Sequence, residues 1–176
     1  MSEKQIMMKY RDELDKSYGV AGMVLGLSAF DADDLLRAVT LDGEHLIQFT
    51  PEFYFAGNPR LSPRGAWKYI LGHYRVTVGL VVANALCRRM ILDNGKVDMD
   101  LREQLFNTAC EDGWESCQLE RDEVQPIFDE AFDSMMRLFG NTQVRRAIDN
   151  FVDHLQQRRT LSHIDVNDFL QQLNLS

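Results

Sequence analysis

Residues 62–92 constrain the fold more than any other part of the chain, because they form one long apolar stretch with a clear helix start. Ser62 is a residue type that caps helix N-termini, and Pro63 suits the first helical position, where a missing N–H is harmless. Nothing breaks the pattern before the turn sequence Asp93-Asn94-Gly95. The sequence therefore predicts a helix of about 30 residues, roughly 45 Å long, around which the rest of the chain must pack.

The middle of this helix is apolar on nearly every side, which is typical of a buried helix or of a membrane span. The uncharged run 76–87 lies between Arg75 and Arg88 and is shorter than the ~20 residues that a span needs. We therefore expect a buried core helix and no membrane span.

Small residues repeat along one line of the helix, at Gly65, Gly72, Gly79 and Ala83. Each glycine inside a helix costs roughly 1 kcal/mol relative to alanine. Two explanations remain open: close approach by a partner, or incidental glycines in a tightly packed helix. Residues 20–30 form a second small-sided segment, and we expect it to pack near this line.

Apolar periodicity predicts helices in most of the remaining chain. A first helix over 3–17 should end at Gly19, and helical spacing resumes over 20–30. Further helices are expected to start near Asp31, Asp98 or Asp100, Asp122, Asn141 or Thr142, and Ser162. The prediction is an all-α single domain over 1–176, with six to eight helices around the central one (about 62–92) and an irregular aromatic arm at about 45–56.

Composition indicates an acidic globular protein. The chain has 176 residues and a net charge of −8, which argues weakly against general nucleic-acid binding. The charge is unevenly distributed: residues 1–57 carry a net −5, residues 58–97 a net +6, and residues 98–176 a net −9. The N-terminal sequence has no apolar signal region, so a cytoplasmic location is expected. The three cysteines form no CxxC pair and are expected to be free thiols.

Motifs that carry chemistry are not found in the sequence. There is no GxSxG, no glycine-rich phosphate loop and no HxxxH spacing, and the stretch LDNGKVDMD does not match the ligand spacing of a calcium loop. We therefore assign no catalytic residue, no metal site and no cofactor, although distant residues could still assemble a catalytic site in the fold.

Basic side chains at the start of the central helix are the candidate anion- or partner-binding site: Arg60, Arg64, Lys68 and Arg75. A helix N-terminus favours anions, so this basic stripe would suit a phosphate, a carboxylate or an acidic protein surface. The alternative is pairing with the protein's own carboxylates. A second candidate site, a pocket or interface, consists of four aromatic residues: Phe49, Phe53, Trp67 and Tyr74.

These observations favour a non-enzymatic helical protein–protein interaction or adaptor module that binds a protein partner or self-associates. The first alternative is anion or nucleic-acid binding through the basic stripe. The second is a small-molecule pocket or an enzyme site between helices, lined by the four aromatic residues.

Overall fold

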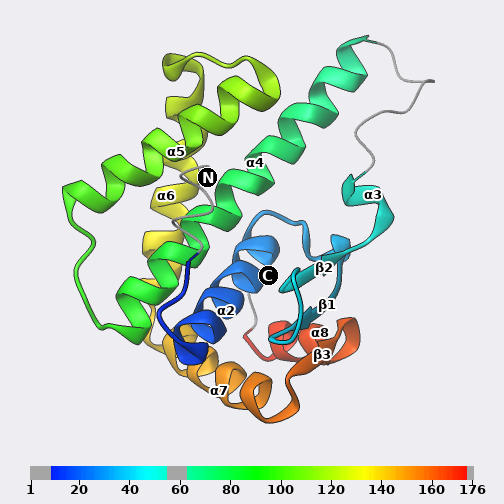
Figure 1. The fold of residues 1–176 in the computed structure, drawn as a ribbon, viewed down its shortest axis with the longest axis vertical. Helices are drawn as coiled ribbons and strands as arrows, with labels where there is room; N and C mark the ends of the chain where they lie inside the picture. The colour runs from blue at the N-terminus through cyan, green and yellow to red at the C-terminus, as the bar shows by residue number, and fades with distance from the viewer. Residues whose placement is uncertain (1–8, 55–62, 174–176) are drawn as a thin grey trace.

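A computed structural model describes residues 9–54 and 63–173, which form a helical bundle with a small antiparallel sheet on one side (Figure 1). In chain order the elements are α2 (Glu13–Ala29), a 3-10 turn (Asp33–Leu35), β1 (Leu36–Thr40), β2 (Ile47–Phe49), α3 (Pro51–Tyr54), α4 (Pro63–Cys87), a π-helical turn (Arg88–Leu92), α5 (Met99–Cys117), α6 (Arg121–Gly140), α7 (Thr142–Arg158), β3 (Thr160–Ser162) and α8 (His163–Gln172). The all-α class and the long central helix are confirmed. The sheet, with strand order β2-β1-β3, was not predicted.

The core is built on the crossing of α2 and α4, which have the most extensive contact of any two elements described. A Cβ atom added at Gly22 would lie 2.5 Å from the Cβ of Cys87 and 2.6 Å from the carbonyl oxygen of Ala83. One added at Gly26 would lie 2.9 Å from the Cβ of Ala83. The two backbones can approach this closely only because the crossing is lined by small residues. The expected packing of residues 20–30 on the glycine line is therefore confirmed.

Helix α2 passes through Gly19, so the predicted end of a first helix at this glycine is wrong. The helix begins at Glu13 after Asp12, whose side chain caps it by accepting a hydrogen bond from the Asp15 amide. A Cβ atom at Gly19 would lie 2.7 Å from Nδ2 of Asn84 on α4, so the glycine allows α2 and α4 to pack closely. Residues 3–8 of the predicted first helix lie outside the described residues.

The short helix expected from Asp31 to Val39 is also wrong. Asp31 has a left-handed backbone with φ of 54°, and the next amide, of Ala32, donates to the carbonyl of Leu27 at 2.8 Å. This is the pattern that ends a helix, so Asp31 terminates α2. Strand β1 follows and pairs with both β2 and β3, which explains why Val39 is buried. A few apolar residues fit a short helix and a strand equally well.

The aromatic arm is largely regular, where an irregular segment was expected. Its first part is strand β2, and Pro51 then begins the single turn of α3. The arm lies against α4, because the Phe53 and His73 rings are 4.5 Å apart and the Tyr69 hydroxyl donates to the carbonyl of Glu52. Residues 55–56 of the arm lie outside the described residues.

Over Pro63–Leu92 the central helix is long and apolar enough, by length and composition alone, to cross a membrane. Within the molecule, 56% of the 18-residue apolar stretch of this helix is buried. A core helix of a soluble protein has the same properties, so this composition carries no argument for a membrane.

The C-terminal helices begin at caps that were mostly predicted. Asp98, Asn141 and Ser162 each accept hydrogen bonds from the first turn of α5, α7 and α8. Helix α6 is the exception, since its capping box is formed by Glu120 and Glu123 two residues before the predicted start. Three fully buried rings fill the core on this side: Phe128, Phe139 and Phe151.

Candidate functional site

The basic stripe faces solvent on the N-terminal half of α4. The described members Arg64, Lys68 and Arg75 are all exposed, and at 100° per residue they lie within about 40° of one another around the helix. Among residues 9–54 and 63–173, none of the three forms an ion pair. Internal pairing, the alternative raised by the sequence, is thus not observed for them. Arg60 lies outside the described residues.

The stripe is exposed because α4 extends beyond the helix that it crosses. Helix α2 contacts α4 at Gly79, Ala83 and Cys87, and the preceding half of α4 projects past the end of α2 (Figure 1). Gly72 lies beside the stripe on this projecting half, and a Cβ added there would meet no described atom within 4 Å. Gly79 and Ala83 of the glycine line are therefore used by the crossing, whereas Gly72 is open.

The opposite face of the same half-helix lines a cavity of about 770 Å³. Four lining residues of α4, Tyr69, Ile70, His73 and Tyr74, lie on this face, roughly 120–260° around the helix from the stripe. The arm supplies Phe49 and Phe53, and further walls come from strand β2, helix α2 and the end of α5. The rings of Phe49 and Phe53 stack at 3.8 Å between centroids.

Two hydroxyl groups in the cavity wall, of Tyr74 and Thr77, are bonded within the protein. The Tyr74 hydroxyl donates to the carbonyl of Ala109 at 2.6 Å, and burial raises the pKa of this phenol above its ordinary value. The Thr77 hydroxyl donates to the carbonyl of His73 at 3.0 Å. The surface left to a ligand is therefore mainly rings and alkyl groups, with the acidic side chains Glu44 and Asp112 among the lining residues.

Three of the four aromatic residues singled out in the sequence, Phe49, Phe53 and Tyr74, line this cavity. Trp67 is not among its lining residues and is 44% exposed. The sequence did not predict that Tyr69, Ile70 and His73 line this site. Their shared helical face with Tyr74 was the signal that could have found them, but only the fold shows that the arm closes over that face.

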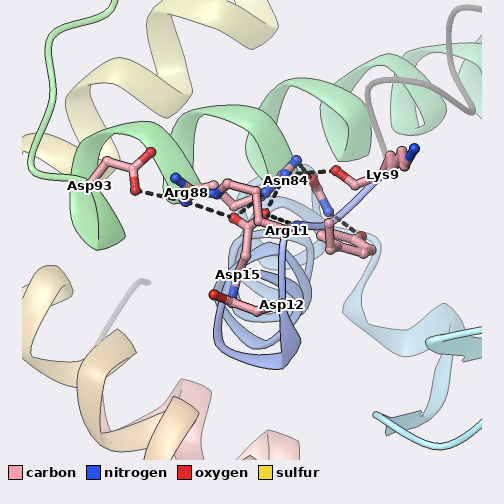
Figure 2. Close-up of polar contacts among 8 residues, drawn as sticks. Lys9, Arg11, Asp12, Asp15, Asn84, Arg88 and Asp93 are labelled. Carbon is pink, nitrogen blue, oxygen red and sulfur yellow. Dashed lines mark hydrogen bonds and ion pairs between the residues drawn. The ribbon is translucent and has the colours of Figure 1, made fainter.

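A buried ion pair ties the N-terminal segment to the end of α4 (Figure 2). Arg88 donates from Nε to Oδ1 of Asp15 at 2.7 Å and from Nη2 to Oδ2 at 2.6 Å, and the Asp15 side chain is 1% exposed. Arg11 bridges Asp15 to Asp93, with its Nη2 2.7 Å from the latter's Oδ1. Asn84 accepts from Arg88 and donates to the Tyr10 hydroxyl at 2.8 Å.

The environment of Asp15 keeps it charged. Burial alone would raise the pKa of this carboxyl, but hydrogen bonds from Arg88 and from the backbone and side chain of Arg11 hold the pKa well below its usual range. Every hydrogen bond here links parts of the protein to one another, so the network has the character of a structural clamp.

Clusters of metal-binding side chains and exposed thiols are not found in the described part of the chain. Within residues 9–54 and 63–173, no three or more His, Cys, Asp or Glu side chains could together hold a metal ion. Cys87, Cys110 and Cys117 are buried free thiols, and burial raises the pKa of each. A buried thiol with a raised pKa is a poor nucleophile.

Comparison with known proteins gives no further guide to the site: no protein-family model, no curated protein and no solved structure matches the chain.

Proposed function

We propose that this protein is a non-enzymatic interaction module that binds an acidic protein surface on the projecting half of α4. The observation that carries the proposal is the exposure of Arg64, Lys68 and Arg75 without an ion pair among the described residues. Five other arginines pair with carboxylates: Arg11, Arg88, Arg102, Arg158 and Arg159. Exposed cations such as Arg37, Arg137 and Arg146 also form no ion pair among the described residues, but they lie on the separate elements β1, α6 and α7. In an acidic protein, three unpaired cations on one helix face suit a negatively charged partner.

The shape of this surface also suits a protein partner. Gly72 leaves the helix backbone open beside the stripe, where another chain can approach closely, and Trp67 adds an exposed ring of the type enriched in interfaces. The protein itself offers acidic surfaces, since residues 98–176 carry a net −9. A second copy is therefore one partner that fits, and a different acidic protein is the other.

Anion or nucleic-acid binding is the second candidate, and the same exposure of Arg64, Lys68 and Arg75 supports it. The net charge of −8 opposes it, because a polyanion would be repelled by most of the remaining surface.

The test is a charge reversal with a matched control. Arg64→Glu/Lys68→Glu reverses two stripe residues, and Arg137→Glu/Arg146→Glu changes the net charge equally at exposed positions on α6 and α7. We expect the first variant alone to lose self-association, measured as solution mass by light scattering, or to lose partners captured from the native cell. Equal loss in both variants, or none in either, contradicts the proposal. Salt-sensitive binding of RNA or DNA lost only in the first variant would favour the second candidate.

A further inference from the structure

The cavity on the opposite face of α4 has the properties of a small-molecule site. Its volume of about 770 Å³ falls within the ~300–1,000 Å³ of typical ligand sites. It is formed by segments distant in sequence, since the arm, α4 and the end of α5 all contribute walls. Two of its wall residues, Tyr74 and Val81, are only 3% and 6% exposed, and the Tyr74 hydroxyl is bonded to α5.

The lining predicts the chemistry of the ligand. Aromatic rings from the arm and α4 provide extensive apolar surface. The exposed carboxylate of Glu44 contributes to the lining, and among the described residues the basic side chains of the lining are His45 and His73, with no lysine or arginine. A carboxylate ligand would therefore meet like charge without a strong cationic partner, whereas an ammonium group would meet opposite charge.

We infer that this cavity binds an apolar organic cation, an aromatic or alkyl molecule that carries an amine. The apolar part lies among Phe49, Phe53, Ile70 and Tyr74, and the ammonium group lies towards Glu44. This site is separate from the proposed protein interface, because the two lie on opposite faces of α4 and use different residues.

Three probes that share a dansyl ring and a short alkyl tail separate the contributions of apolar surface and charge. Dansylcadaverine ends in an ammonium group, dansyl-6-aminohexanoic acid ends in a carboxylate, and N-hexyl dansylamide ends in a methyl group. Fluorescence titration of the full chain should give the tightest binding for the ammonium probe and the weakest for the carboxylate probe. Loss of one favourable charge contact should weaken binding about 1.5- to 5-fold.

Two sets of variants locate the binding. Glu44→Gln should reduce the preference for the ammonium probe, while Glu130→Gln, an equal charge change at an exposed position on α6, should not. Ile70→Trp places a larger ring in the cavity and should weaken all three probes by about 10-fold or more, whereas Ile164→Trp, at a residue 70% exposed on α8, should leave them unchanged. If Ile70→Trp does not fold, Thr77→Phe fills the same space from the next turn.

The inference is overturned by any of three results. These are failure of every probe to bind, binding that filling the cavity does not weaken, and a carboxylate or methyl probe that binds as tightly as the ammonium probe. A preference for the ammonium probe that Glu44→Gln and Glu130→Gln reduce equally would also overturn it, since that preference would come from the net charge of the protein.

Discussion

Arg88 holds Asp15 through two parallel hydrogen bonds, and this pair joins the start of α2 to the end of α4 across 73 residues of sequence (Figure 2). Both partners are largely withdrawn from water, with side-chain exposures of 15% for Arg88 and 1% for Asp15. A charge in such a place is tolerated only while its partner remains. The pair is therefore a sensitive point for the stability of the whole molecule.

Removing one partner should destabilise the protein strongly. Arg88→Met leaves the Asp15 carboxylate buried without its main partner, and the expected loss is about 3–5 kcal/mol of unfolding free energy, measured by urea denaturation. Arg102→Met is the matched control, because the Arg102–Asp129 pair is 35% and 39% exposed and should contribute about 1 kcal/mol or less. Equal losses of unfolding free energy in the two variants would contradict this prediction, because they would show that removing Arg88 does not leave Asp15 as a costly buried charge.

The same pair should make the protein sensitive to acid. The pKa of Asp15 in the folded state lies below its ordinary value of 3.8. The contribution of Asp15 to stability is therefore complete well above pH 3.8, and it is lost as the pH falls from about 3.8 towards the lower pKa of the folded state. We expect unfolding free energy to decline below about pH 4 more steeply in the wild type than in Asp15→Asn. Urea denaturation from about pH 7 to about pH 3 measures this difference, and parallel curves would contradict it.

Two glycine-to-alanine substitutions should have opposite effects. Gly22→Ala forces a methyl group against the Ala83 carbonyl oxygen at the helix crossing and should lower unfolding free energy by about 1–3 kcal/mol. Gly72→Ala adds a methyl group in open space and removes a flexible residue from a helix, so it should raise unfolding free energy by about 0.5–1 kcal/mol. Melting temperatures test both signs. A destabilised Gly72→Ala would show that this glycine already packs within the protein.

Thiol reactivity should follow burial. Cys87 is fully buried at the helix crossing with a raised pKa, so it should react with a disulfide reagent such as DTNB only when the protein opens. Cys117 lines the cavity and is 8% exposed, so it should react faster than Cys87 in the native state. Mass spectrometry of partly labelled protein gives the order, and reaction in denaturant provides the control in which all three thiols are equivalent. Faster labelling of Cys87 would contradict the packing at Gly22.

Some features of the fold were accessible from sequence because they depend on neighbouring residues. The caps Asp98, Asn141 and Ser162 act within three residues of their own positions, and the length of α4 follows from a run without breakers. The packing of Gly22 and Gly26 on α4 was also predicted, because small residues on two helices favour each other. Close helix contacts of this kind require small residues at regular spacing, and that spacing is visible in the sequence.

The secondary structure of residues 31–40 depends on partners that are distant in the sequence. Strand β1 exists because Val39 lies opposite both Ile47 and Leu161, and the last of these pairings joins residues 122 positions apart. Local spacing does not contain that information, so a strand was read as a helix. The same reason explains why Gly19 was assigned to a helix end, since the residue that requires a glycine there is Asn84 on another helix.

The sequence by itself determined the helical class, the central helix, most helix starts and the residues of the basic stripe. Only the tertiary structure decided what α4 presents on each side. Arg64 and Lys68 remain exposed because α2 ends its contact at Gly79, and Tyr74 lines a cavity because the arm folds over that face. Helix formation is set by nearby residues, whereas the exposure of a helix face is set by which distant segments cover it. Helix α4 therefore has an exposed basic face and a face that lines a cavity, and its sequence alone did not distinguish the two.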